Sequence, residues 1–135
     1  MIAYQLLQYL ENQGFGTDGV DLFCDFMPDS PENNITLYNE QAASLPESDS
    51  LAIDRFGLQV MVRNSNSNTA MEKIMQIHRL ITGFGGESLI AGGNIVSYIT
   101  LETSPFSLGK DEKGLNKWTG HYNIRVQSIN DKYRD

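Results

Sequence analysis

The stretch "DRFGLQVMVRN", residues 54–64, is the clearest strand pattern in this chain. Two sets of side chains alternate along it, with Phe56, Leu58, Val60 and Val62 on one side and Arg55, Gly57, Gln59, Met61 and Arg63 on the other. An alternation with a period of two predicts a β-strand that has one face in a core and the other on polar surroundings. The segments on either side must then supply the layer that covers the apolar face.

Both neighbouring regions contain a segment that predicts a helix. Residues 2–13 repeat apolar side chains at helical spacing, and Gly14 follows as the stop. A second helical pattern runs to Gly83, with Thr69 and Glu72 at the spacing of a capping box at its start. His78 falls at the edge of the apolar stripe of this helix, which favours a histidine at the border of the core.

Four further segments read as strands: "VDLFCDF" (20–26), "NITLYNEQ" (34–41), "NIVSYITLETSPF" (94–106) and "KWTGHYNIRVQSI" (117–129). In the first, Val20, Leu22, Cys24 and Phe26 alternate, so Cys24 is expected to be a small buried residue. In the last, Trp118 and Tyr122 are expected to anchor the core. The glycine-rich "GFGGESLIAGGN" (83–94) reads as a connection.

The order helix–strand–strand–strand–helix–strand–strand predicts an α+β fold. Grouped strands favour a mostly antiparallel β-sheet with the two main helices packed against one face. The length of 135 residues suits one domain, 1–135, with a single core. No apolar run is long enough to span a bilayer, so no membrane partner is expected.

Charge is distributed unevenly along the chain. Up to Asp54 the sequence has ten acidic residues and no Lys or Arg, whereas residues 55–135 contain all ten basic residues and seven acidic ones. The net charge of -7 disfavours binding to free nucleic acid. The two parts either neutralise each other within one monomer or bring an acidic surface of one subunit against a basic surface of the next. The second arrangement is head-to-tail and generates a ring or a filament.

The sequence shows no constellation typical of catalysis. The glycines of residues 83–93 follow a helix and precede a strand without a lysine, which excludes the usual phosphate-binding loops. His78 and His121 have no partner at metal-ligand spacing, and the single Cys24 can form no disulfide within the chain. We therefore expect no enzyme activity, no cofactor and no metal. A lone cysteine also favours a reducing compartment such as the cytoplasm.

The hairpin "SLGKDEKGLN", residues 107–116, carries a charged tip between Gly109 and Gly114. No nucleophile, base or metal set converges there, which disfavours an active site. A partner-docking loop and a merely solvated tip remain open alternatives.

Four segments in their order along the chain carry a resemblance: "MPDSPENNITLYN" (27–39), "FGLQVMVRN" (56–64), "AMEKIMQIHRLITG" (70–83) and "PFSLGKDEKGLNKWTGHYNI" (105–124). The chain resembles the tail terminator proteins of long-tailed bacteriophages (siphophages), in particular the group of phage minor capsid proteins. The specific parts are the Pro-Asp-x-Pro turn, the arginine that closes the long strand and the hairpin tip.

This resemblance implies a structural virion protein without catalytic activity. Such proteins form a hexameric ring on the finished tail tube, end its polymerisation and offer the surface that joins the head. The implied partners are further copies of the chain, the major tail tube protein and a head-completion or connector protein, with DNA passing through the lumen without specific binding. The interface candidates are Arg55, Arg63, Lys110, Asp111 and Lys113, and Arg63→Glu is expected to weaken assembly without harming the fold.

Two other readings stay open. The first is a neighbouring component of the virion, either another head–tail connector or a tail-tube subunit, which would polymerise into long cylinders. The second is a small non-catalytic α+β domain that binds a ligand in a pocket between helices and sheet. A native mass measurement distinguishes them, because a discrete hexamer favours the terminator.

Overall fold

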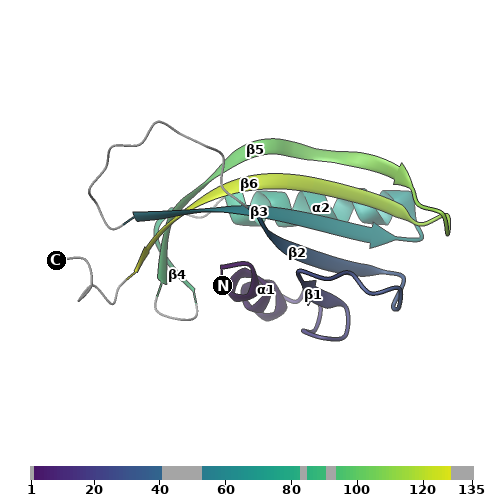
Figure 1. The fold of residues 1–135 in the computed structure, drawn as a ribbon, viewed down its shortest axis with the longest axis horizontal. Helices are drawn as coiled ribbons and strands as arrows, with labels where there is room; N and C mark the ends of the chain where they lie inside the picture. Colours follow the sequence, from purple (N-terminus) through teal and green to yellow (C-terminus); the bar gives the residue numbers. More distant parts are fainter. Residues whose placement is uncertain (1, 41–52, 83–84, 91–93, 129–135) are drawn as a thin grey trace.

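The computed structural model describes residues 2–40, 53–82, 85–90 and 94–128 and confirms the α+β class. Its elements, in chain order, are α1 (Ile2–Asn12), β1 (Leu22–Cys24), β2 (Asn34–Glu40), β3 (Ile53–Asn64), α2 (Ser67–Thr82), β4 (Gly85–Ile90), β5 (Asn94–Lys110) and β6 (Asn116–Ser128). The strands form one sheet in the order β1-β2-β3-β6-β5-β4 (Figure 1). The pair β1–β2 is parallel and the other pairs are antiparallel.

The predicted strand at residues 54–64 lies in the middle of this sheet. β3 pairs with β6 along its whole length, from Ile53 opposite Gln127 to Asn64 opposite Asn116. The apolar residues Leu58, Val60 and Val62 are fully buried, which confirms the period-two pattern where side chains are described. Tyr122 of β6 is buried opposite Leu58, as expected of a core anchor, and a half-buried Trp118 packs against the same core.

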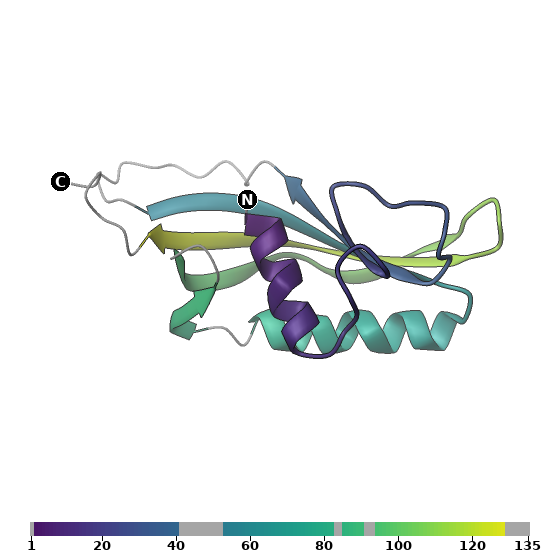
Figure 2. The same ribbon diagram turned by 90° about the horizontal axis from the view of Figure 1, so that it is seen from below.

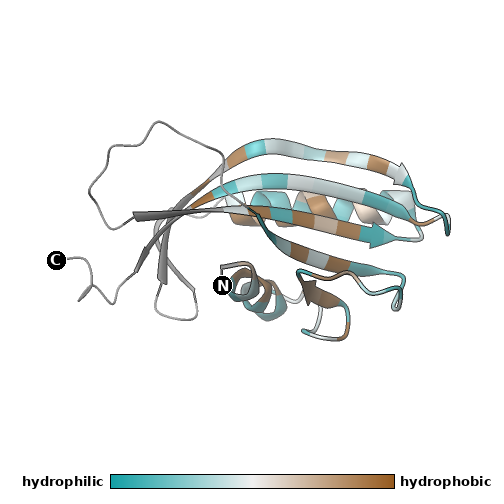
Figure 3. Cartoon of the chain, in the orientation of Figure 1, coloured by the Kyte–Doolittle hydropathy of each residue, from teal (hydrophilic) through white to brown (hydrophobic). Residues whose placement is uncertain are grey.

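Both helices cover the same face of the sheet (Figure 2). α1 packs on β1 and β2, and α2 packs on β3, β5 and β6. Each helix turns an apolar stripe inward, visible as the brown bands in Figure 3; the buried members are Ala3, Leu6, Leu7, Leu10, Ala70, Ile74, Ile77 and Ile81. Each large aliphatic side chain in this layer contributes roughly 1.5–3 kcal/mol by leaving water. The opposite face of the sheet has no helix over it among the described residues.

The helix ends are set by capping residues. Gly14, two residues after the end of α1, has φ 89°, and the amide of Phe15 donates to the carbonyl of Leu10 at 3.0 Å, as in a Schellman motif. α2 begins earlier than the sequence predicts, because Asn66 is its N-cap: the Oδ1 atom accepts the amide of Thr69 at 3.0 Å. The proposed capping box at Thr69 is therefore wrong, and Gly83 lies outside the described residues.

One strand was missed by the sequence prediction. β4 lies within the glycine-rich segment that reads as a connection, and it pairs with the start of β5, from Ile90 opposite Asn94 to Gly85 opposite Tyr98. A bulge between Gly85 and Ser88 interrupts the pairing. Glycines and the bulge hide the period-two pattern that identifies a strand.

The predicted first strand is much shorter than its alternation suggests. Leu22 is buried and Cys24 is half-buried against the core, but Val20 and Phe26 are 59% and 67% exposed. Val20 belongs to a turn, in which its amide donates to the carbonyl of Thr17 at 3.0 Å. At the other end Asp25 has φ 63°, outside the strand region, so the chain turns away before Phe26.

A polar clasp holds this short strand in place. Asp25 accepts the backbone amide of Asn39 and its side-chain amide, both at 2.7 Å, and Asn39 in turn accepts the amide of Ala3 in α1. Burial, together with the charge of Asp25, raises the pKa of the Cys24 thiol to about 11. Cys24 is thus a protonated packing residue at neutral pH.

Candidate functional site

A charged cleft of about 600 Å³ opens on the sheet face opposite the helices, beside the turn between β5 and β6. Tyr38 of β2 and Arg63 of β3 lie at its base, with residues 27–32 on one side and the hairpin tip on the other. The lining contains four basic and three acidic side chains: Arg63, Lys110, Lys113 and Lys117, and Asp29, Asp111 and Glu112. Alternating charges of both signs suit a charged segment of a polypeptide better than an apolar small molecule.

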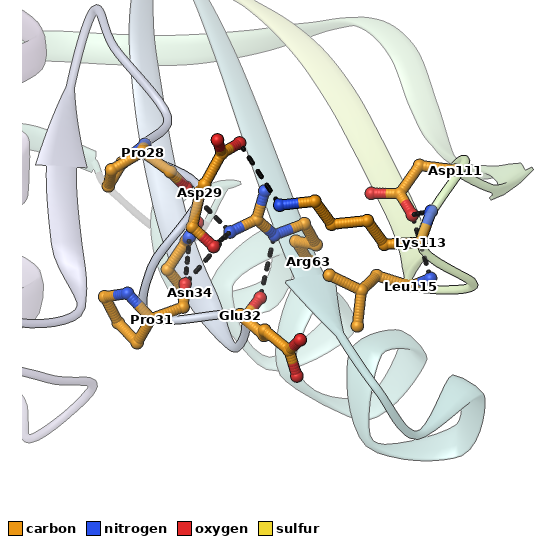
Figure 4. Close-up of polar contacts among 9 residues, drawn as sticks. All are labelled: Pro28, Asp29, Pro31, Glu32, Asn34, Arg63, Asp111, Lys113 and Leu115. Carbon is orange, nitrogen blue, oxygen red and sulfur yellow. Dashed lines mark hydrogen bonds and ion pairs between the residues drawn. The ribbon is translucent and has the colours of Figure 1, made fainter.

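Arg63 holds the loop on one side of this cleft. Its guanidinium donates from Nη2 to the carbonyls of Pro28 at 2.7 Å, Asp29 at 3.0 Å and Pro31 at 2.9 Å, and from Nε to that of Glu32 at 2.8 Å (Figure 4). The residue is only 4% exposed. Four carbonyl oxygens turned toward one buried cation fix the path of the loop.

The loop needs such a clamp because its own sequence forms little regular structure. Pro28 and Pro31 have no backbone amide hydrogen to donate. Asn34 adds one further contact, since its Nδ2 donates to the carbonyl of Pro31 at 3.0 Å. The side chain of Arg63 therefore replaces the backbone pairing that a strand would have provided.

Asp111 organises the hairpin tip on the other side. Its Oδ1 accepts the amides of Lys113 and Leu115, both at 2.9 Å, and its own amide donates to the carbonyl of Leu115 at 2.8 Å (Figure 4). The hydrogen bonds from these backbone amides, above all the one from Leu115, lower the pKa of Asp111. The positive charges of Lys117 and Arg63 act in the same direction. Gly114 completes the turn with φ 78°, a region that favours glycine.

The two sides of the cleft meet at one ion pair. Nζ of Lys113 lies 3.7 Å from Oδ1 of Asp29, and these side chains are 54% and 88% exposed (Figure 4). An exposed pair at this distance is weak and is screened by salt. The pair therefore connects the two sides of the cleft only weakly.

Four of the five interface candidates meet at this cleft: Arg63, Lys110, Asp111 and Lys113. Arg55 is not among them, because it lies toward the other end of β3, where its backbone pairs with Arg125; its side chain lies outside the described residues. The burial of Arg63 changes what its replacement would do. Arg63→Glu would turn a carboxylate toward four carbonyl oxygens, so the expectation of an unharmed fold does not agree with the geometry.

The cleft also contains residues that the sequence did not single out. Tyr38 lies on the cleft side of β2 because side chains alternate between the two faces of a strand. Burial raises the pKa of its hydroxyl, while the positive charge of Arg63 opposes this shift. Asp29 and Lys117 line the cleft only because the loop at residues 27–32 and the hairpin between β5 and β6 lie close together in space. The Pro-Asp-x-Pro turn was a signal for Asp29, but no sequence pattern connects it to Lys113.

The histidines make structural contacts. Nδ1 of His78 lies 2.8 Å from the hydroxyl of the buried Tyr122, which confirms its place at the border of the core. Nδ1 of His121 lies 3.0 Å from Oε1 of Glu40 on the sheet face that bears the cleft. Within the described ranges, no group of three or more His, Cys, Asp or Glu side chains could hold a metal ion, and no helix there has the length and apolarity to cross a bilayer.

Comparison with known proteins places these features in a family. No curated protein matches the chain. The family model of the bacteriophage tail terminator protein matches residues 9–128, which contain the last turn of α1, all six strands, α2 and every residue of the cleft. This family is one of structural tail proteins rather than enzymes. The chain belongs to the bacteriophage tail terminator protein family.

Proposed function

We propose that this protein closes into a hexameric ring on the end of a phage tail tube, ends the polymerisation of the tube and presents the surface to which the head is joined. The observation that carries the proposal is the family match over residues 9–128. The protein would then act in the virion at the junction of tail and head, after assembly in the bacterial cytoplasm.

Its partners would be further copies of the chain, the major tail tube protein and a head-completion or connector protein. The genome would pass through the lumen of the ring without specific binding. A net charge of -7 supports this, since an acidic protein gives phosphates few counter-charges to hold.

The cleft would provide part of the contact with a neighbouring protein. Lys110 and Lys113 are exposed on the hairpin tip and can reach a partner directly. Arg63 and Asp111 would act indirectly, because the first fixes the loop at residues 27–32 and the second fixes the tip. A contact built on two fixed loops loses less conformational entropy on binding.

The proposal is tested by polymerising the purified tail tube protein with increasing amounts of this protein and measuring tube length by electron microscopy. We expect tubes that stop growing, with one additional ring at an end. The variant Lys110→Glu with Lys113→Glu should cap fewer tubes. Arg79→Glu, a single charge reversal on the exposed side of α2, is the control and should cap normally.

Two outcomes would contradict the proposal. Tubes that grow equally long in the presence of the protein would exclude a capping role. Long cylinders made by this protein alone would instead identify a tube subunit, because a terminator stops at one ring.

A further inference from the structure

The outer edge of β5 is long and only partly covered by another strand. β5 spans Asn94–Lys110, far longer than the typical strand of about 5–6 residues. β4 pairs with it only as far as Tyr98. Beyond that point, in the part of the chain that the structure describes, no strand lies along its outer side (Figure 1).

This edge also exposes large apolar side chains. Leu101, Phe106 and Leu108 are 46%, 39% and 49% exposed, and all three belong to the part of β5 that β4 leaves uncovered. We define these residues as the β5 flank. A long strand edge with exposed apolar side chains is a site of association unless a partner covers it.

The backbone of β5 nevertheless opposes continuous strand pairing with a partner. The register against β6 shifts four times, between Val96 and Tyr98, Leu101 and Thr103, Thr103 and Phe106, and Ser107 and Gly109. Pro105 has no amide to donate, and Glu102 places a charge on the edge. A partner must therefore bind mainly through side chains rather than by extending the sheet.

A matching surface lies at the opposite side of the sheet. β1 is the other edge strand, and Val20 and Phe26 project beside it with exposures of 59% and 67%. We define these two residues as the β1 flank. Residues 15–31 around it contain four acidic side chains and no basic one, whereas residues 108–117 at the end of the β5 flank contain three lysines and two acids. Both flanks therefore expose apolar side chains. The region around the β1 flank has a net negative charge, and the end of the β5 flank has a net positive charge.

We infer that the β5 flank of one copy of this chain binds the β1 flank of the next copy. Because the two flanks differ and lie on opposite edges, the contact is head-to-tail, and its repetition generates a ring when the rotation between neighbouring copies closes. The inference rests on the proposed function in taking the ring as the product. It accounts for five of the seven large apolar side chains that are exposed among the described residues; the other two, Tyr4 and Met71, lie on the helices.

Two variants and their mixture test the contact. Leu101→Lys with Leu108→Lys breaks the β5 flank, and Val20→Lys with Phe26→Lys breaks the β1 flank. Each alone should associate at least about tenfold more weakly than wild type, as expected when central apolar side chains are lost. An equimolar mixture should form a heterodimer and stop, since only one intact contact remains. Met71→Lys, on the exposed side of α2, is the control and should assemble like wild type.

Native mass spectrometry distinguishes the outcomes, and circular dichroism verifies that each variant is folded. Unchanged assembly of either double variant would overturn the inference. So would a β1-flank variant that assembles while the β5-flank variant does not join it, since that pattern means a contact between two β5 flanks. A wild type that stays monomeric at high concentration would also overturn it.

The tube-length assay separates this inference from the proposed function. If the flanks behave as predicted but the wild-type ring leaves tube growth unchanged, the contact stands and the terminator role fails. If both flank variants cap tubes as wild type does, the role stands and the contact fails.

Discussion

Two loops face each other across the cleft, and the chain fixes them by opposite means. The loop at residues 27–32 is held by a buried cation, Arg63, that donates to carbonyls. The hairpin tip is held by a carboxylate at the surface, Asp111, that accepts amides. The two sides of one site therefore differ in stability, because the contacts of the buried Arg63 are shielded from water and salt and those of Asp111 are not.

The largest loss of stability should come from Arg63→Met, which keeps an aliphatic side chain and removes the guanidinium. Four carbonyls lose their donor, so we expect a loss of about 2–4 kcal/mol in the free energy of unfolding. Urea denaturation of the monomer measures it. The stability of Arg63→Lys should fall between those of the wild type and Arg63→Met, since an ammonium group cannot donate to four carbonyls as the planar guanidinium does. A loss below about 0.5 kcal/mol for Arg63→Met would mean that the loop holds itself.

A smaller loss of stability is expected from Gly114→Ala in the hairpin tip. Gly114 has φ 78°, and a Cβ there meets no atom within 4 Å, so only backbone strain opposes the change. We expect a loss of about 1 kcal/mol, the usual cost of a left-handed residue with a side chain. Gly114→Asn should lose less, because asparagine tolerates this region better. Equal losses for both would point to a cause other than backbone strain.

The contribution of Asp111 to stability should depend on pH, and the Asp111→Asn variant tests this. The fold lowers the pKa of Asp111, so its ionised form contributes stability above the ordinary carboxyl pKa, and that contribution is lost as pH falls through the lowered value. The wild type should therefore lose its advantage over Asp111→Asn in acid. Melting temperatures from about pH 7 to about pH 2, which bracket carboxyl titration, measure the difference. A difference that stays constant over this range would contradict the assignment.

The smallest effect should follow Lys113→Ala, which removes the ion pair with Asp29. The pair is exposed, so we expect at most about 1 kcal/mol, vanishing in high salt. Thermal melts at low and high salt concentrations check this. Asp29→Ala should give the same loss, and the double variant should lose no more than either single one. Additive losses would show that the two side chains act independently.

The sequence predicted the fold through local periodicity. Leu58, Val60 and Val62 alternate clearly, and the two helices show apolar stripes, because each pattern depends on neighbours in the chain. β4 was missed, since the glycines around it carry no such pattern. Val20 and Phe26 were assigned to a strand because alternation cannot reveal a turn at Thr17 or a positive φ at Asp25.

The site was predictable only in part. The charged hairpin was visible, and its candidates Lys110, Asp111 and Lys113 do meet Arg63 at one cleft. The burial of Arg63 was not visible, because a polar position in a strand says nothing of which loop covers it. Backbone carbonyls of Pro28, Asp29, Pro31 and Glu32 leave no trace in the sequence, and they determine what Arg63 does.

The central position of β6 has a consequence for when the protein can fold. β6 lies between β3 and β5, so two of the longest pairings in the sheet wait for residues 116–128. β3 and β6 are separated by more than fifty residues, and such distant pairings form slowly. On the ribosome, a chain that has not yet released β6 has neither a finished sheet nor a positioned β5. A partly synthesised chain therefore has no completed β5 flank before residues 116–128 are in place.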